Sequence, residues 1–515
     1  MPVKGRRTSL PADVIGDDFT PNCLNVRFRF GEIRPTPGRN ILAGSVGVGQ
    51  TPLWIGQFPL PDGTTWIVML TTTRMFRWGA SAPGTPRNWN EVLPGDTVPV
   101  GNTRWSVAIG EGKIFFARHE DLIYYWTGVA TDPFRSIVAQ AGVQGTVPKA
   151  KFIEYFNNRL IAAFTTEASV DKSNRLRWTE SANFLHWDET LALGAGFLDL
   201  VEGGQEAIRG LRCFSTQMMV TTKRTIKEII ATGTTPTHVE ALRARGMGCD
   251  SPYTVASAGQ QAFFVGYDFN IYAWDGIRLI PIGEPIYEEL KSVTSPGQNE
   301  NYFAAVSTTR QEYWFVLPSG DAFIFDYIRG TWARDTVPSF TALGEVEDTL
   351  GTETWATSSG PWSTDFGTWE MLRGTNHTIL VGGRTDGSTS FIDDLISSDY
   401  FEVDGVMSRF VETPDFYIDE NAGAKLGTVY RVLLNYRFVN DNPLAVGISF
   451  DRGKSWKEQV VTPVIAGFSW VDFEGTGNVF RFRFRQDDAT GAFGWRSYTY
   501  EIQTDAGDFI GTTTA

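Results

Sequence analysis

Cysteine and histidine are scarce in this sequence. The 515 residues include three cysteines, Cys23, Cys213 and Cys249, which are odd in number and lie far apart. They provide neither a disulfide framework nor a CxxC metal pair, so a reducing compartment during assembly is expected rather than secretion. The histidines show no HxH or HExxH spacing, which argues against a metal site, and no cofactor is expected. The four histidines are His119, His186, His238 and His377.

Long apolar runs and strongly charged segments are also missing. No run approaches the roughly eighteen apolar residues of a membrane span, and the basic start MPVKGRRTSLPADVIGDD has no apolar stretch behind it. Neither a membrane-spanning segment nor a classical export signal is therefore expected. Charged residues make up only 20% of the chain, which indicates an ordered globular protein.

Positive charge is in deficit. The formal net charge of -14 disfavours electrostatic capture of nucleic acid, because neutralising phosphates requires clustered Lys and Arg. An acidic surface commonly serves solubility alone. It also suits a conduit through which DNA slides without adhering, since like charges oppose adhesion.

Helix signals are few, and strand and turn formers are abundant. Only PIYEELKS, residues 285–292, predicts one or two helical turns, with Pro285 at the first position. Aromatic residues reach 13%, and 53 Gly and 25 Pro supply turns, which together favour many short strands. At this length the chain exceeds one ordinary core, so several domains or one large repeat architecture is expected.

The stretch from Gly248 to Leu290 shows a complete small unit. Apolar β-formers occur in four short runs, at 253–256, 262–266, 271–274 and 277–282. Asp275-Gly276 separates the last two runs, and Asp-Gly between apolar runs is a strong hairpin signal. Four strands joined by tight turns are what one blade of a β-propeller needs.

Weak internal repeats extend this unit along the chain. A Trp, a Ser three residues later and a second Trp followed by Asn or Asp and Glu recur in 78–91 and 178–189. Recurrence at roughly forty to sixty residues favours propeller blades over a single sandwich. We count about six or seven candidate units and assign residues 41–400 to an all-β propeller domain.

Both ends of the chain differ from this repeat. Residues 1–40 are expected to form an N-terminal arm with a strand in 25–38, which either closes the propeller ring by pairing with the last blade or forms a plain edge strand. From residue 401 the strands lengthen: Phe480, Phe482 and Phe484 alternate with three arginines in VFRFRFRQ. Residues 401–515 are therefore expected to form a C-terminal β-sandwich, platform-like in role.

Two motifs resemble functional sites but are expected to shape turns. Ser449-Phe-Asp451-Arg-Gly453-Lys-Ser-Trp456 matches the Asp-box pattern S-x-D-x-G-x-x-W, in which Asp and Gly form a turn that Trp covers. Sialidases carry such boxes outside their catalytic apparatus. GSVGVGQTP, residues 44–52, lacks the Lys-Ser/Thr of a phosphate loop and is expected to be a flexible turn.

No catalytic constellation is placed by the sequence, so no enzyme is expected. A glycosidase would need two carboxylates across a cleft, and Ser-His-Asp chemistry would need a G-x-S-x-G elbow, which is absent. The aromatic clusters Tyr124-Tyr125-Trp126 and Trp362 with Trp369 are expected to pack between blades rather than to stack on sugars. The candidate carboxylates are Glu370, Asp393, Asp394, Glu412 and Asp415.

The order of phrases resembles one family, the tail nozzle or tail hub proteins of short-tailed bacteriophages. The matching phrases are NVRFRFGEIRPTPG, NRLIAAF, LRWTESANFLHWDE, IRGLRCFSTQMMVTTKRTIKEI, GMGCDSPYTV, QQAFFVGYDFNIYAWDG, IGEPI, SRFVETPDF, ISFDRGKSW and FRFRFRQ. They cover most of the chain. The stretch 341–387 matches none of them and is expected to be an insertion.

This resemblance implies a virion structural protein, assembled in the bacterial host cytoplasm. It implies a homohexameric ring below the portal and the head-to-tail adaptor, which forms the distal channel for genome ejection. Tail fibres or tailspikes and a tail needle or plug are the implied neighbours, and double-stranded DNA would pass without specific binding. Repeated acidic copies would present negative charge to that DNA.

Two other classes stay open at this stage. A carbohydrate-binding or glycan-depolymerising propeller would line one exposed cleft with aromatics and two carboxylates. A generic interaction propeller would be monomeric and soluble alone.

Overall fold

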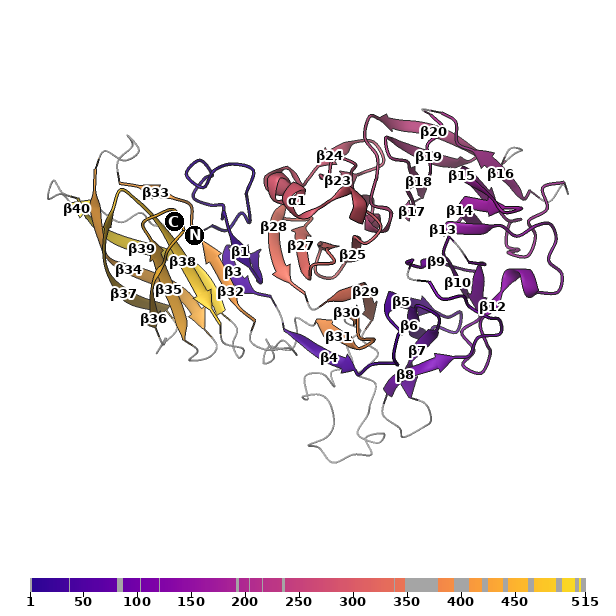
Figure 1. Ribbon diagram of the computed structural model, residues 1–515, viewed down its shortest axis with the longest axis horizontal. Helices are drawn as coiled ribbons and strands as arrows, with labels where there is room; N and C mark the ends of the chain where they lie inside the picture. The colour runs from indigo at the N-terminus through magenta and orange to yellow at the C-terminus, as the bar shows by residue number, and fades with distance from the viewer. Residues whose placement is uncertain are drawn as a thin grey trace.

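The computed structural model is almost entirely antiparallel β-structure, arranged as seven four-stranded sheets and two six-stranded sheets (Figure 1). No helix of the described residues is long and apolar enough to cross a membrane. The structure describes residues 2–36, 38–80, 87–101, 103–119, 121–190, 194–202, 204–214, 216–233, 237–337, 339–347, 378–392, 407–418, 425–438, 443–461, 467–487, 493–504 and 509–510.

The first three four-stranded sheets follow one another along the chain. The first contains β5 (Pro52–Pro59), β6 (Thr65–Thr71), β7 (Met75–Ala80) and β8 (Arg87–Val92). The second contains β9 (Ser106–Gly110), β10 (Lys113–Ala117), β11 (Tyr124–Trp126) and β12 (Arg135–Ser136), followed by the 3-10 helix η1 (Ile137–Ala139). The third contains β13 (Lys149–Phe156), β14 (Arg159–Glu167), β15 (Val170–Trp178) and β16 (Gly196–Asp199).

The next three sheets repeat the same meander. The fourth contains β17 (Gly210–Phe214), β18 (Gln217–Thr221), β19 (Thr225–Ala231) and β20 (His238–Arg245). The fifth contains β21 (Ala256–Ala258), β22 (Gln261–Val265), β23 (Ile271–Trp274) and β24 (Leu279–Pro281). The sixth contains β25 (Phe303–Ser307), β26 (Glu312–Val316), β27 (Asp321–Asp326) and β28 (Thr331–Thr336).

The seventh sheet combines both ends of the propeller sequence. Its strands are β29 (Phe340–Glu347), β30 (Thr378–Arg384), β31 (Thr389–Ile392) and β4 (Arg39–Ala43). β4 therefore closes the ring. The strand expected in 25–38, for which ring closure was one of two alternatives, does not pair with the last blade. The ends of 341–387, the stretch expected to be an insertion, belong to the seventh blade, because they supply most of β29 and all of β30, while 348–377 lies outside the described residues.

Seven hydrophobic cores join the seven sheets into a closed ring. Each core takes its buried side chains from two consecutive sheets, and one of them joins the seventh sheet back to the first through Ile55, Met69 and Val381. Because neighbouring sheets bury their faces against each other in an unbroken cycle, the domain is a β-propeller. The predicted propeller is confirmed at this level, and the described blades number seven.

The unit from Gly248 to Leu290 forms the fifth blade, with one shift. Its second and third runs are strands and the fourth contains β24, but the 3-10 helix η2 (Pro252–Thr254) takes up the first half of the first run. Pro252 fixes a helical φ there, and the strand begins only at Ala256. The predicted turns near Pro285 are confirmed as η3 (Glu284–Ile286) and α1 (Tyr287–Val293), which precede η4 (Pro296–Gln298).

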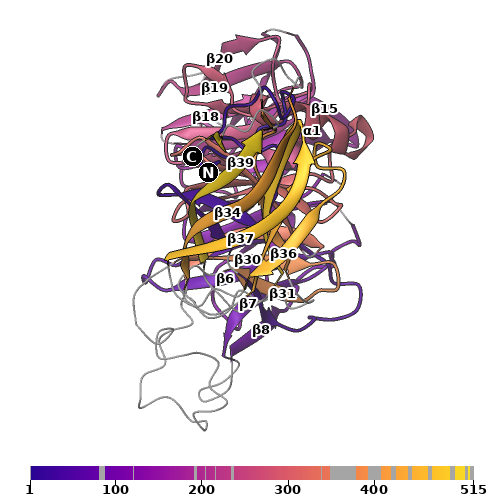
Figure 2. The same ribbon diagram turned by 90° about the vertical axis from the view of Figure 1, so that its left-hand side faces the viewer.

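Two six-stranded sheets form the second body of the molecule. One contains β1 (Cys23–Leu24), β32 (Arg409–Glu412), β33 (Phe416–Tyr417), β35 (Leu444–Ser449), β36 (Lys457–Val461) and β38 (Val479–Gln486). The other contains β2 (Val26–Arg29), β3 (Glu32–Pro35), β34 (Gly427–Phe438), β37 (Gly467–Gly477), β39 (Phe493–Thr504) and β40 (Phe509–Ile510). Figure 2 shows the long strands β34, β37 and β39 crossing in front of the propeller.

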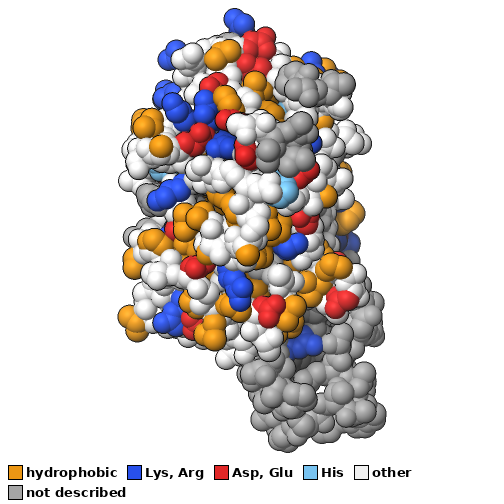
Figure 3. All heavy atoms as spheres, turned by 90° about the vertical axis from the view of Figure 1, so that its right-hand side faces the viewer, with side chains coloured by type: hydrophobic (Ala, Val, Ile, Leu, Met, Phe, Trp, Pro, Cys, Tyr) orange, Lys and Arg blue, Asp and Glu red, His pale blue; other side chains and the backbone are white. Residues whose placement is uncertain are grey.

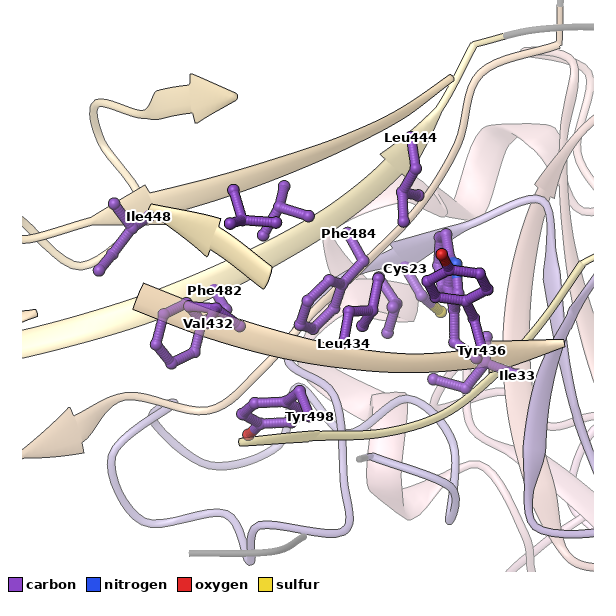
Figure 4. Close-up of a cluster of buried hydrophobic side chains, with 14 of the residues drawn as sticks. Cys23, Ile33, Val432, Leu434, Tyr436, Leu444, Ile448, Phe482, Phe484 and Tyr498 are labelled. Carbon is purple, nitrogen blue, oxygen red and sulfur yellow. The ribbon is translucent and has the colours of Figure 1, made fainter. Parts of the chain in front are cut away.

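One hydrophobic core is shared by these two sheets. Phe482 and Phe484 of β38 are fully buried and lie close to Leu434 and Tyr498 of the other sheet (Figure 4). The alternation in VFRFRFRQ is thus confirmed, since the phenylalanines face the core and the intervening arginines face away from it.

The N-terminal arm belongs structurally to this second body. β1 pairs with β32, β2 and β3 form a hairpin, and β3 pairs with β39 through Ile33 and Trp495. β1 and β2 also contact β28 of the sixth blade. The expected N-terminal arm thus pairs with the C-terminal sheets and contacts the sixth blade, and its last two residues begin β4 of the seventh blade.

Side chains of both charge signs are mixed among the described residues of the propeller edge farthest from the C-terminal sheets. Figure 3 shows Lys and Arg, Asp and Glu, and hydrophobic side chains interspersed on this face, with hydrophobic side chains gathered near its middle. This mixture does not favour capture of nucleic acid on that face, which would require clustered cations.

Candidate functional site

The two candidate carboxylates within the described residues are held in ion pairs. Glu412, at the end of β32, is 3.2 Å from Arg481 Nη1 and 2.6 Å from Arg483 Nη2, and Asp415 is 2.8 Å from Arg481 Nε. Both carboxylates are buried. They neutralise the arginine face of β38 and do not face each other across an open cleft. Glu370, Asp393 and Asp394 lie outside the described residues.

The other sequence candidates are structural wherever they are described. Tyr124 and Trp126 are buried in the core between the first two blades, while Trp362 and Trp369 lie outside the described residues. Across the described ranges, no group of three or more His, Cys, Asp or Glu side chains is placed to hold a metal ion. His377 lies outside those ranges. Residues 44–51 form a loop and not a strand or helix, as expected for GSVGVGQTP.

The Asp box forms the hairpin between β35 and β36. Asp451 Oδ1 accepts hydrogen bonds from Ser449 Oγ at 2.7 Å and from the Ser455 amide at 2.8 Å. These hydrogen bonds lower the pKa of Asp451 to about 2, with the Ser455 hydroxyl as the largest cause. Gly453 adopts φ 84°, and Trp456 covers the turn by donating to the Gly453 carbonyl. The motif is a turn device, as predicted.

A buried ionic cluster lies where the N-terminal arm meets the sixth blade. Arg27 of β2 donates from Nε to Glu312 Oε1 at 2.9 Å and from Nη1 and Nη2 to Asp335 at 2.8 Å each. Arg29 adds a second contact to Glu312 at 2.8 Å, and Arg39 lies 3.6 Å from Asp335. We call these five residues the junction cluster.

Burial makes the ion pairs of the junction cluster costly to break. Glu312 and Asp335 are 1% and 0% exposed, so removing a partner would leave an uncompensated charge inside the protein. Burial opposes the charge on Arg27, but Asp335 and then Glu312 outweigh it and raise the pKa of Arg27. The arginines likewise lower the pKa of Glu312 against its desolvation. The cluster thus ties the N-terminal arm to β26 and β28 of the sixth blade.

A second contact reinforces the same boundary. Arg6 donates from Nε and Nη2 to the two carboxylate oxygens of Glu289 at 2.7 and 2.8 Å, and Arg334 reaches Glu289 at 3.0 Å. Glu289 lies on α1, directly after the fifth blade. The arm therefore binds both the fifth and sixth blades through paired arginines.

The central axis of the propeller is crossed by side chains at one end. Lys151 of β13 lies 2.5 Å from Glu300, which precedes β25 three blades further on. Arg104, just before β9, donates to the Thr341 carbonyl of β29 and stacks 3.9 Å from the centroid of the Phe303 ring. Side chains from the third and sixth blades thus meet across the axis at this end.

Neither the junction cluster nor the contacts across the propeller axis could be predicted from the sequence, for one reason. The partners of Arg27 lie 285 and 308 positions away along the chain, so no local pattern points to them. No sequence pattern points to Arg104, Lys151 and Glu300 as neighbours. Each of them lies at the innermost strand of a different blade, and only the closed ring brings them together.

Comparisons with known proteins add a likeness of fold. No protein-family model matches the chain, and no curated protein matches it. Among solved structures, the WD40 repeats of RRP9 share 10% identity at a TM-score of 0.39, covering 70% of this chain and 99% of that one. A structure of U3-55K shares 10% identity at a TM-score of 0.39, covering 69% of this chain and 99% of its own. Similarity at this level says nothing about what the chain binds.

Proposed function

We propose that this chain is a structural subunit of a short-tailed bacteriophage tail, a nozzle or hub protein of the distal DNA-ejection channel. The observation that carries the proposal is the junction cluster, which fixes the propeller to the C-terminal sheets through buried arginines of the N-terminal arm. A rigid block of two β-bodies suits a load-bearing wall better than an enzyme with moving domains. The sequence phrases shared with nozzle proteins support the same assignment.

The C-terminal body has a natural place in this proposal. Its two six-stranded sheets share one core, so we infer a β-sandwich that serves as a platform in the tail. Tail fibres or tailspikes, the head-to-tail adaptor and a needle or plug are the proposed neighbours.

DNA would pass between protomers and not through a propeller. Side chains cross the propeller axis, as the Lys151–Glu300 pair shows, so a DNA-sized channel requires a ring of several copies. A homohexamer of chains that each carry -14 would face DNA with like charge, which opposes adhesion. A closed ring also covers sheet edges that a lone chain exposes.

Electron microscopy of the full chain tests this proposal. Negative-stain images and mass photometry of the purified protein, together with labelling of the source particle, should give a sixfold ring and density at the tail tip. A stable monomer absent from any tail would contradict it. Release of sugars from soluble glycans by that monomer would favour the alternative of a glycan-depolymerising propeller.

A further inference from the structure

The chain is acidic overall, but one end of the propeller axis is not. Each blade has four antiparallel strands, and its first strand is the innermost one. The chain therefore returns to the same end of the propeller before the innermost strand of each blade begins. Arg104, Lys151, Arg209 and Glu300 lie at or just before the starts of inner strands, and therefore gather at one end. We call these four residues the axial cluster.

Contacts across the axis join Lys151, Arg209 and Glu300, and Arg104 reaches the same end through Phe303. Glu300 Oε1 lies 2.5 Å from Lys151 Nζ and 4.0 Å from Arg209 Nη1, so one carboxylate serves two cations. Phe303, three residues after Glu300, lies under the guanidinium of Arg104. Lys151 Nζ lies 5.8 Å from the centroid of the Phe152 ring, and the Phe152 and Tyr253 ring centroids are 6.3 Å apart.

Arg104 has only neutral partners among the described residues. It donates to the Thr341 carbonyl and stacks on Phe303, and no described carboxylate pairs with it. Burial lowers the pKa of Arg104 to about 10. The nearby Asp250 does not supply the missing charge, because Asn299 donates to it at 2.7 Å and Lys223 lies 3.6 Å away.

The cluster therefore holds positive charge in excess. Its three cations and one carboxylate leave two positive charges in excess within the part of the chain that the structure describes, and an enclosed cation without a counter-charge is costly. Solvent still reaches the cluster, since the Glu300 and Arg209 side chains are 49% and 33% exposed. A small anion has a route to it.

We propose that the axial cluster is an anion-binding site for a phosphate-type oxyanion. The Arg104 fork and the Arg209 guanidinium supply paired N–H donors of the geometry that phosphate oxygens accept, and Lys151 adds a point charge. The β-bulge at Phe340/Ala342 turns the Thr341 carbonyl toward Arg104 and holds this guanidinium at the axis.

Calorimetric titration of the full chain with inorganic phosphate at low salt tests this site. The wild type should bind about one phosphate per chain, and Arg104→Gln should weaken binding at least about tenfold, as expected for the loss of a charge-assisted pair. Arg278→Gln is the matched control, because Arg278 is 77% exposed and lies in the turn between β23 and β24. This control should bind phosphate like the wild type.

A second variant keeps the test decisive if Arg104→Gln does not fold. Arg209→Gln removes a partly exposed member of the cluster and should weaken phosphate binding several-fold with an unchanged circular dichroism spectrum. Absence of saturable phosphate binding to the wild type would overturn the proposal, as would equal binding by a folded Arg104→Gln or Arg209→Gln chain. These outcomes do not depend on whether the protein forms a tail ring.

Discussion

Arg27 and Asp335 form a bidentate ion pair in which Nη1 and Nη2 of the arginine donate to Oδ1 and Oδ2 of the carboxylate, each at 2.8 Å. The pair joins the N-terminal arm to the last strand of the sixth blade, and both side chains are almost fully buried. Planar, paired contacts fix orientation as well as distance. This geometry makes the two bodies of the protein one mechanical unit.

Arg27→Leu should destabilise the protein by about 3–5 kcal/mol, because it leaves Glu312 and Asp335 buried without their main partner. Chemical denaturation measures the loss. Arg278→Gln, an exposed arginine in an i,i+3 pair, should change stability by less than about 1 kcal/mol. A loss below about 1 kcal/mol for Arg27→Leu would show that the junction cluster does not hold the arm.

Glu412→Gln should lower stability by about 3 kcal/mol, because Arg481 and Arg483 lose a buried counter-charge. Glu458→Gln on the same sheet is the control: its pair with Arg485 is partly exposed, so a change of about 1 kcal/mol or less is expected. Thermal unfolding compares the two variants. A stable Glu412→Gln chain that lost a glycan-cleaving activity would instead assign this carboxylate to catalysis.

His238 should make the protein less stable in mild acid. Burial lowers its pKa from 6.5 to about 4, with a smaller effect of Arg159. The unfolded chain therefore takes up a proton below pH 6.5 while the folded chain does not, so stability is full above 6.5 and falls towards pH 4. The loss reaches on the order of 3 kcal/mol.

The difference in unfolding free energy between wild type and His238→Gln, measured from pH 7.5 to 4, checks this prediction. The wild type should lose stability relative to the variant across that range. An imidazole that titrates near 6.5 in the folded protein by NMR would contradict it.

Asp451 should keep its hairpin closed in acid. Its pKa is about 2 against an ordinary 3.8, so its contribution is present above pH 3.8 and is lost as the pH falls through about 2. Carboxyl NMR should show titration near pH 2, and slow exchange of the Ser455 amide should persist to about pH 3. Asp451→Asn should lack this pH step. Titration near 3.8 would mean that the hydrogen bonds of the turn do not form.

The three thiols should react slowly in the folded protein. Burial raises the pKa of Cys249 to about 12, and it also raises the pKa of Cys23 and of Cys213, where Glu154 adds to the effect. A thiol reagent at pH 8 should modify the native chain slowly and all three cysteines after denaturation. Rapid modification of one thiol in the native chain would place it in a more accessible environment.

Much of the local structure followed from the sequence. The blade from Gly248 to Leu290, the Asp-box turn and the alternating phenylalanines of β38 were all predictable, because turn chemistry and two-residue periodicity act between near neighbours. The blade number and the bounds of β21 were less accessible. Short apolar runs do not reveal which of them pair, and Pro252 converted part of one expected strand into a 3-10 helix.

Composition and pattern by themselves determined an all-β chain with propeller-like repeats, a distinct C-terminal region and no recognisable catalytic motif. Only the tertiary structure decided that β4 closes the ring, that the N-terminal arm joins the C-terminal sheets, and that Arg27 meets Asp335 and Lys151 meets Glu300. The physical reason is separation along the chain. These contacts join residues about 150 to 460 positions apart, and strand pairing and buried charge are satisfied by whichever partners the folded chain brings together.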